Sequence, residues 1–309
     1  MSPATILITS ASGRTSSYVL KALLDRLPSL SQPPQIRLLV HNKSSIQKVV
    51  STFGELSPTS FVIGDYLDYS SLSECFRDVD VLFYNGPAFH PNETAMGINV
   101  INAAKQMGVK HFVYSSVLHP YLTNLLNHKA KLGVEEYLTE SGLPYTILQP
   151  SSLMQNIPID TLIKDNSSDS ISLECAYNPR TMQGFLYLPD LAEIAASILL
   201  DPELHLLASY PLVGENISLE AVSAILSEET GRPATCILAN REHGKAVQRE
   251  KAARMYGEAV SEWCGEAWER MVFYYDKRGI PGNTNIARWL LGREPTTWKV
   301  WVRSLLKEA

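Results

Sequence analysis

The chain has 309 residues, of which 45% are hydrophobic and 19% charged, and its formal net charge is -5. This composition is typical of a globular protein with one large domain, or with a large and a smaller one. The acidic balance and the lack of any run of Lys or Arg argue against a nucleic-acid-binding face. The four cysteines stand far apart without a CxxC pair, which argues against a metal site and a disulfide framework.

The first ten residues, MSPATILITS, carry no positive charge, and their apolar run is too short for a signal peptide or a membrane span. Later apolar stretches are either strand-sized or interrupted by charges. We therefore expect a soluble, cytoplasmic protein with no membrane partner.

The first half of the chain alternates short apolar runs with amphipathic segments. Six strands that take turns with helices predict a parallel sheet covered by helices on both faces. The expected strands are almost entirely apolar, as in strands buried on both sides. The sequence thus predicts an α/β fold with a Rossmann-like doubly wound parallel sheet. The strands are expected at 5–9, 32–42, 59–65, 80–87, 110–117 and 145–150, and the helices at 15–27, 44–54, 70–79, 93–108 and 128–142.

After Pro150 this rhythm loosens. The pattern predicts a helix at 190–201 that begins with an Asp-x-x-Glu capping box, a strand at 209–214, a helix at 218–232 capped by Ser218, and helices from about residue 240 onward. We predict a dinucleotide-binding domain at residues 1–155. Residues 156–309 are predicted to form a smaller, mainly helical substrate region, with segments at about 183–215 returning to the main sheet.

The stretch ITSASGRTSS, residues 8–17, follows the first expected strand and precedes the first helix. In a dinucleotide-binding βαβ unit, three glycines at this place permit the tight turn, the approach to the pyrophosphate and close helix packing. Here those positions hold Ser10, Gly13 and Ser16. Serine is small and can cap the helix, whose amino terminus still offers N–H groups to an anion. We predict a dinucleotide-binding loop; the alternative is a capped turn without a ligand.

The residues at the end of the second expected strand indicate which dinucleotide the chain would bind. The segment LLVHNKSS lacks the acidic residue that would bind the ribose of NAD. It offers His41 and Lys43 instead, and Arg14 directly follows Gly13. Such donors suit a 2′-phosphate, so we expect NADP(H). The alternative is that Lys43 and Arg14 are solvated surface charges.

Two further loops lie at the same edge of the expected sheet. Asp65 and Tyr66, in the segment GDYLD, are predicted to face the adenine, and the alternative for Asp65 is an ordinary turn. Asn85, Gly86 and Pro87 end the fourth strand, where small residues would let the cofactor pass.

Several segments together resemble the NmrA-like family, atypical members of the short-chain dehydrogenase/reductase superfamily. They are ASGRT, GDYLD, INAAKQMGVKHFVYSSV, VEEYLTESGLPYTILQP and MQN. In addition, NIARWLLGREPTTWKVWV near the end is similar to the tail of fungal members. The resemblance covers most of the chain. It implies a nicotinamide cofactor, and the family includes both NADPH-dependent reductases and proteins that only sense the cofactor.

Most members of that superfamily use a Ser, a Tyr and a Lys, with Tyr-x-x-x-Lys on one helix. The resemblance matches this lysine to Lys131, but Asn127 stands in place of the tyrosine, so the usual proton donor is absent. His128 is a candidate general acid near neutral pH, or else a structural histidine. Ser116, at the end of the fifth strand, is predicted to orient a carbonyl. The alternative for Lys131 is a surface pair with Glu135.

The segment from Pro150 to Gln155 resembles the family loop that passes near the nicotinamide. The predicted catalytic residues are Lys131, His128 and Ser116, and no metal site is expected. The predicted cofactor contacts are Ser10, Ser12, Gly13, Arg14, Thr15, His41, Lys43, Asp65, Tyr66, Asn85, Gly86, Pro87, Lys131, Pro150 and Ser152.

The leading hypothesis is an NADP(H)-dependent oxidoreductase that acts on a small or medium organic substrate, a carbonyl or conjugated compound. The resemblance implies a setting in fungal secondary metabolism. A non-catalytic NADP(H)-sensing regulatory protein is the alternative, favoured by the missing tyrosine and the loop with one glycine. The third hypothesis is a cofactor-free isomerase, dehydratase or cyclase in the same fold.

Overall fold

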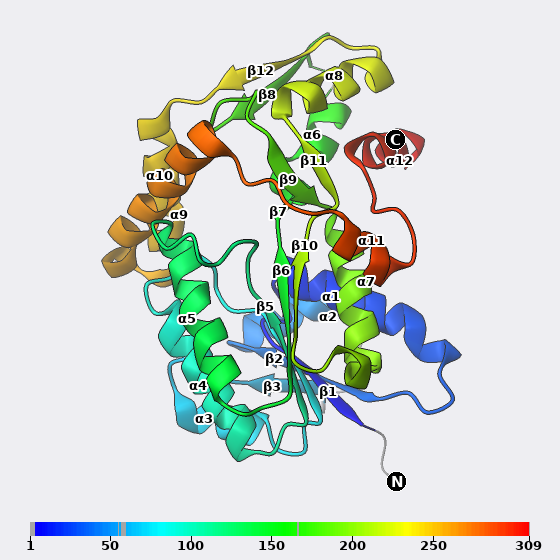
Figure 1. Cartoon of the computed structure of the whole chain (residues 1–309), viewed down its shortest axis with the longest axis vertical. Coiled ribbons are helices and arrows are strands. Elements are labelled where there is room, and N and C mark those ends of the chain that lie inside the picture. Colours follow the sequence, from blue (N-terminus) through cyan, green and yellow to red (C-terminus); the bar gives the residue numbers. More distant parts are fainter. Residues whose placement is uncertain (1–3, 55, 57–59, 166, 309) are drawn as a thin grey trace.

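The computed structural model describes residues 4–308 apart from 55, 57–59 and 166 (Figure 1). Its main sheet has seven strands in the order β10-β6-β5-β4-β1-β2-β3, and all neighbouring pairs are parallel. Of the strand expected at 59–65, residue 59 lies outside the described residues. The strands are β1 (Thr5–Ile8), β2 (Gln35–Val40), β3 (Phe61–Ile63), β4 (Val81–Tyr84), β5 (His111–Ser115), β6 (Tyr145–Pro150) and β10 (Ala208–Leu212).

Helices cover both faces of this sheet, so the predicted α/β fold is confirmed (Figure 1). One face carries α1 (Arg14–Arg26), α2 (Lys43–Phe53) and α7 (Leu188–Leu200). The other face carries α3 (Tyr69–Cys75), α4 (Glu93–Gln106) and α5 (Leu126–Glu140). Since both faces are covered, the strands are buried on both sides, which explains their apolar sequence.

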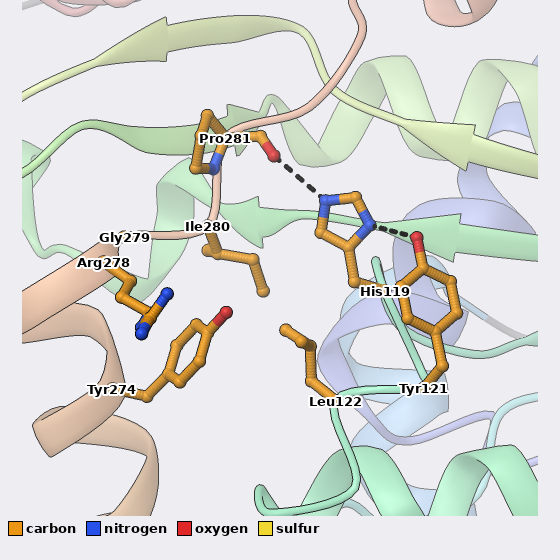
Figure 2. Close-up of a pocket in the computed structure, with 8 residues that line it drawn as sticks. All are labelled: His119, Tyr121, Leu122, Tyr274, Arg278, Gly279, Ile280 and Pro281. Atoms are coloured by element: carbon orange, nitrogen blue, oxygen red, sulfur yellow. Dashed lines mark hydrogen bonds between the residues drawn. The ribbon is translucent and has the colours of Figure 1, made fainter.

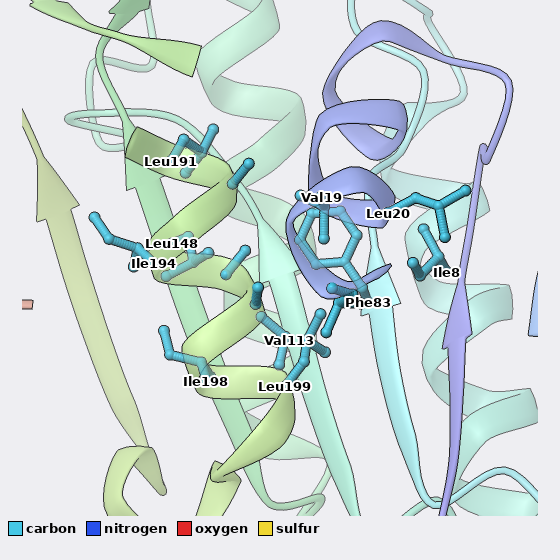
Figure 3. Packing of buried hydrophobic residues seen from close by; sticks show 14 of the residues in the cluster. Ile8, Val19, Leu20, Phe83, Val113, Leu148, Leu191, Ile194, Ile198 and Leu199 are labelled. Carbon is cyan, nitrogen blue, oxygen red and sulfur yellow. The ribbon is translucent and has the colours of Figure 1, made fainter. Parts of the chain in front are cut away.

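The core between the sheet and helices α1 and α7 brings together distant parts of the chain. Figure 3 shows Val19 and Leu20 of α1 near Phe83 of β4, with Leu191 and Ile194 of α7 in the same cluster. All five side chains are almost completely buried. A helix from the second half of the chain therefore completes the layer that begins with α1.

The second half also forms two small sheets that the sequence did not predict. One contains β7 (Ser152–Leu153), β9 (Gln183–Leu186) and β11 (Glu215–Ile217), and the other pairs β8 (Ile171–Cys175) with β12 (Ala234–Leu238). β7, β9 and β11 have only two to four residues, too few for a periodic pattern, whereas ISLEC in β8 does alternate buried and exposed residues, as a half-buried strand would. The remaining helices are α6 (Ile159–Lys164), α8 (Leu219–Thr230), α9 (Arg241–Tyr256), α10 (Ser261–Arg278), α11 (Asn285–Leu291) and α12 (Trp298–Glu308).

Strand β10 lies beside β6 at the edge of the main sheet. The chain after residue 155 thus contributes both a strand and the helix α7 to the main layers, and a domain boundary at residue 155 stays a prediction. Over the described part of the chain, no helix has the length and apolar character needed to cross a membrane.

The expected capping box at the start of α7 is wrong. The helix begins at Leu188, so Asp190 lies within its first turn. The buried Asp190 carboxylate instead accepts hydrogen bonds from the Arg293 guanidinium at 2.9 Å and from the backbone N–H of Thr296 at 2.6 Å. The acid therefore ties α7 to the segment before α12. The predicted Ser218 cap of α8 is confirmed, because its hydroxyl accepts a hydrogen bond from the backbone N–H of Ala221 at 3.2 Å.

Candidate functional site

Three loops at the carboxyl edge of the main sheet carry backbone strain. Ser10, Phe89 and His119 follow β1, β4 and β5, and their φ angles are 48°, 58° and 54°. This left-handed region disfavours residues with a Cβ. Strained residues of this kind cluster at functional sites, and open α/β sheets bind ligands at this edge. Two further left-handed residues, Asp78 and Leu207, precede β4 and β10 at the opposite edge, so the three strained loops coincide with the sequence motifs but do not select this edge by themselves.

The loop between β1 and α1 keeps the shape of a phosphate loop without its first glycine. Ser10 takes the left-handed conformation that glycine adopts freely. Its carbonyl accepts a hydrogen bond from the N–H of Gly13 at 2.7 Å, and its hydroxyl lies 2.8 Å from the Tyr66 hydroxyl. A Cβ on Gly13 would lie 3.0 Å from the Ser10 carbonyl oxygen. The turn therefore needs the middle glycine, while hydrogen bonds hold the serine in place.

The amino terminus of α1 is open to an anion. Gly13 is its N-cap, no side chain caps it, and the first turn holds no acidic residue. The N–H groups of Arg14, Thr15 and Ser16 have no acceptor within the helix, and the helix dipole adds a partial positive charge. The Ser16 hydroxyl is buried without a hydrogen-bond partner among the described residues. Together with the half-buried Ser12, these groups fit a pyrophosphate.

Arg14 does not face the end of β2. Its guanidinium donates hydrogen bonds to the carbonyl oxygen of Gln155, at 2.8 Å, and to the side chain of Asn156. These residues follow β6 and β7, and β6 and β2 lie on opposite sides of β1 in the sheet. The prediction that Arg14 reaches a 2′-phosphate is therefore not supported by this conformation. His41 and Lys43 remain exposed at the end of β2, on either side of the residue that caps α2.

Asp65 and Tyr66, which follow β3, have different contacts. The carboxylate of Asp65 accepts a hydrogen bond from the N–H of Leu67 at 2.9 Å, so this acid forms the ordinary turn that was the alternative. Tyr66 lies against the phosphate loop through its bond to Ser10. Of the two residues predicted to face the adenine, only Tyr66 thus contacts another predicted site residue.

The segment Asn85–Pro87 lies half-buried next to the phosphate loop. The N–H of Asn85 donates to the hydroxyl of Thr9, at 3.0 Å, which ties the ends of β4 and β1 together. A Cβ on Gly86 would lie 2.7 Å from the Tyr84 hydroxyl, so no larger residue fits there without a shift. The glycine is explained by the protein itself, and a passing cofactor is not needed to account for it.

Lys131 and Glu93 form a buried ion pair at the end of β5. The Lys131 amine lies 2.7 Å from a Glu93 carboxylate oxygen, and the side chains are only 10% and 1% exposed. The same amine lies 5.6 Å from the centre of the Tyr114 ring and 3.5 Å from the Ser115 carbonyl oxygen. Lys131 therefore does not form the surface pair with Glu135 that was the alternative. Burial raises the pKa of Glu93, and the nearby Lys131 opposes this rise.

Tyr84 and Tyr114 stack next to this ion pair. They are register partners on β4 and β5, and their ring centres lie 5.6 Å apart. Burial raises the pKa of both phenols well above the usual value, and the Glu93 carboxylate adds to the rise. Neither phenol is therefore activated as a proton donor in place of the missing tyrosine.

Sequence reasoning missed Glu93, Tyr84 and Tyr114. An acid in the first turn of a helix usually complements the helix dipole at the surface, so Glu93 gave no signal of burial. The two tyrosines stand at the ends of consecutive apolar strands, the one feature in the sequence that could have placed them side by side.

His128 is buried and neutral. Its Nδ1 atom lies 3.0 Å from the carbonyl oxygen of His119, which can only accept, so Nδ1 carries the proton. Burial lowers the pKa of His128 to about 4. Nε2 then bears a lone pair and has no partner among the described residues. The general-acid role predicted for His128 near neutral pH is therefore not supported by the structure.

Ser116 lies between the ends of β5 and β6. Its N–H donates to the carbonyl oxygen of Leu148 at 2.7 Å, and its hydroxyl is buried without a well-aligned hydrogen bond. Burial raises the pKa of the nearby Glu135, and the side chains of Ser116 and Gln149 partly offset this rise. The Gln149 amide donates to both carboxylate oxygens of Glu135, at 2.9 and 3.1 Å. The Ser116 hydroxyl thus lies close to the Glu135 carboxylate and the Tyr114 phenol, which would compete with a ligand for it.

The loop after β6 joins this group. The carbonyl oxygen of Pro150 accepts a hydrogen bond from the N–H of Leu118 at 2.8 Å. Ser152 begins β7 and is half-buried, and the hydroxyl of Ser151 is buried without a partner in the described part of the chain. Unpartnered buried polar atoms therefore gather at the ends of β5 and β6, where a nicotinamide would find donors and acceptors. No group of three or more residues that could hold a metal ion occurs among the residues described.

The comparison with known families decides the relationship of this chain. Residues 2–272 match the NmrA-like family. The chain belongs to the NmrA-like family. This result confirms the resemblance that the phosphate-loop and strand-end motifs indicated.

Known proteins are similar to this chain in sequence, in structure or in both. Quinone oxidoreductase 2 of Escherichia coli is 28% identical over 151 residues, 49% of this chain and 50% of that protein. The chain thus spans about half the length of the curated relatives it matches. Among solved structures, an NADPH-dependent quinone oxidoreductase from Escherichia coli in complex with NADPH gives a TM-score of 0.74 at 22% identity, over 97% of this chain and 99% of that one. Nmra, a negative transcriptional regulator in complex with NAD, gives 0.69 at 18% identity, over 100% and 97%.

The Lys131–Glu93 pair predicts a specific pattern of stability. Lys131→Met leaves a buried carboxylate without a partner, so we expect the free energy of unfolding to fall by about 3–5 kcal/mol. The double variant Lys131→Met/Glu93→Gln removes both charges and should recover a large part of this loss. Urea unfolding at neutral pH measures both values. Equal losses in the single and the double variant would contradict the pairing.

The buried histidines predict sensitivity to acid. Burial lowers the pKa of both His111 and His128 from 6.5 to about 4. At a pH between about 4 and 6.5 these histidines are protonated in the unfolded chain but not in the folded one. The free energy of unfolding therefore decreases as the pH falls from about 6.5 towards 4. We expect a loss of about 2 kcal/mol per histidine between pH 7 and pH 5. Urea unfolding between about pH 7 and pH 5 measures this loss. In His128→Gln the free energy of unfolding should depend less steeply on pH, and an unchanged dependence would contradict a buried neutral His128.

Proposed function

We propose that this NmrA-like protein is an NADP(H)-dependent oxidoreductase. The observation that carries the proposal is that the uncapped amino terminus of α1 and the buried Lys131 lie at the same edge of one parallel sheet. A dinucleotide that binds across this edge would extend from the loop after β1 to the end of β5. The NADPH bound to the similar quinone oxidoreductase structure supports this choice of cofactor.

We assign the adenosine 2′-phosphate to Lys43 and His41. Both are exposed at the end of β2, and the segment from His41 to Ser45 contains no acidic residue. The pyrophosphate is assigned to the first turn of α1 with Ser12 and Thr15. Arg14 lies across this loop and is assigned to its closure against Gln155 and Asn156.

Bound NADPH would supply a hydride from its nicotinamide ring. Lys131 is assigned to the ribose hydroxyls, with Glu93 holding its amine in place, and Ser116 to the oxygen of a substrate carbonyl. His128 is neutral, so solvent is the proposed source of the proton. A site with a hydride but no dedicated acid suits carbonyl and conjugated substrates, among them quinones. A role in fungal secondary metabolism rests on the resemblance of the sequence tail and stays a prediction.

The second candidate is a protein that binds NADP(H) as a signal without turnover. The missing tyrosine and the neutral His128 favour it, since neither Asn127 nor His128, in the first turn of α5, is poised to donate a proton. The similarity to a transcriptional regulator in complex with NAD is compatible with it. The third candidate, a cofactor-free isomerase, dehydratase or cyclase, would use the same edge of the sheet.

The assignment of the 2′-phosphate predicts an asymmetric effect of two substitutions. Lys43→Ala should weaken NADPH binding about tenfold, because it removes a charge-assisted contact, and leave NADH binding unchanged. Arg14→Ala should leave the ratio of the two affinities unchanged. Calorimetric titration of each variant with NADPH and with NADH measures this. A lost preference in Arg14→Ala but not in Lys43→Ala would reverse the assignment.

Turnover separates the three candidate functions. An oxidoreductase is expected to oxidise NADPH when one of a panel of quinones, enones and aldehydes is present. The loss of NADPH absorbance at about 340 nm measures this reaction. Micromolar NADPH binding without turnover of any of these compounds would favour the sensor. The absence of NADPH binding would overturn the proposal and leave the cofactor-free reaction.

A further inference from the structure

A pocket of about 360 Å³ lies between the loop after β5 and the carboxyl end of α10 (Figure 2). Its volume is in the range of pockets that bind small molecules. His119, Tyr121 and Leu122 line it from the loop, and Tyr274 and Arg278 line it from the helix. None of these residues belongs to the cofactor contacts assigned above.

The walls of this pocket combine apolar and polar surface in similar shares. Leu122 and Ile280 point into the space from opposite elements, and the ring of Tyr274 stands beside them (Figure 2). Ile280 also belongs to a buried cluster with Leu118 and Leu125, so the pocket wall continues into the core. A flat apolar ring could therefore displace water from these walls.

His119 is fixed as a structural part of the wall. Its Nε2 atom lies 3.0 Å from the carbonyl oxygen of Pro281 and therefore donates, so its Nδ1 atom accepts from the Tyr121 hydroxyl at 2.9 Å (Figure 2). Its own carbonyl oxygen accepts from His128, which lies three residues before Lys131 on α5. The strained residue thus connects the pocket to the helix that carries Lys131.

Two polar groups of the pocket have no partner within the part of the chain that is described. They are the Tyr274 hydroxyl and the Arg278 guanidinium. The other cations of α10 are paired, Arg270 with Glu266 and Lys277 with Asp276. A guanidinium presents a planar fork of donors that matches a carboxylate, and a phenol can donate one further hydrogen bond. The pocket therefore combines apolar surface at Leu122 and Ile280 with a half-buried phenol and with a guanidinium that is exposed to solvent and has no partner among the described residues.

We propose that this pocket binds the substrate, and that the substrate is an aromatic or conjugated ring that bears an anionic group. The ring would lie between Tyr274 and the side chains of Leu122 and Ile280. Arg278 would bind the carboxylate or a similar anion, with a hydrogen bond from Tyr274. This inference rests on the proposed function, because it places the ring beside the loop that leads to Lys131.

The test uses a matched pair of unreactive probes, 2-naphthoate and 2-naphthamide, which differ in charge but hardly in shape. Calorimetric titration of the full chain, with NADPH present, should give tighter binding of 2-naphthoate. In Arg278→Met, which keeps an apolar stem, binding of 2-naphthoate should weaken about tenfold and binding of 2-naphthamide should stay unchanged. Tyr274→Phe should weaken 2-naphthoate a few-fold.

Lys277→Met is the matched control, because it removes the same charge from the neighbouring residue, which does not line the pocket. It should leave the affinity of both probes unchanged. Equal affinities of the two probes, no binding of either, or equal losses in Arg278→Met and Lys277→Met would overturn the proposal.

The titration with NADPH alone keeps the two proposals apart. Arg278→Met should bind NADPH as tightly as the unsubstituted chain does. If NADPH binds but the binding of 2-naphthoate does not depend on Arg278, the anionic substrate class is wrong while the oxidoreductase proposal stands. If NADPH does not bind and 2-naphthoate still depends on Arg278, the proposed function fails and the anion-binding pocket stands.

Discussion

The buried pair between Lys131 and Glu93 is the interaction on which the site depends. A charge removed from water is stable in a protein only when it is paired, so each of these side chains fixes the position of the other. Glu93 begins α4 and Lys131 lies within α5, and the two helices approach so closely that a Cβ on Gly97 would lie 2.4 Å from Val134. The ion pair and this close contact therefore place the lysine amine at the ends of β4 and β5 before any ligand binds.

The strained loops at the same edge are held by contacts from distant parts of the chain. The left-handed Ser10 is bonded to Tyr66, beyond β3, and the left-handed His119 is bonded to Pro281, beyond α10. Such conformations persist only where surrounding structure enforces them. The second half of the chain therefore does more than cover the sheet, because it fixes the loop between β5 and α5 that lines the pocket beside α10.

The electrostatics of the site explain why reductase and sensor are both compatible with this family. Burial keeps His128 neutral and the phenols of Tyr84 and Tyr114 protonated. The site thus offers donors and acceptors for binding, while neither His128 nor either of these phenols is tuned to release a proton near neutral pH. A reaction in which solvent can supply the proton would suit it, and so would binding without chemistry.

The amino-acid order was enough to predict the alternation of strands and helices, the position of the phosphate loop and the candidate lysine, because periodicity, glycine placement and motif spacing are local properties of the chain. It assigned Arg14 to a 2′-phosphate and a proton-donating role to His128, which the contacts of these side chains do not support, and it did not find Glu93 or the pocket at Arg278. Each of these depends on contacts across many residues, such as Arg14 with Gln155 or His119 with Pro281. These features arise only when the chain folds, since the fold brings distant segments together and thereby sets which side chains are buried, which are paired and which are charged.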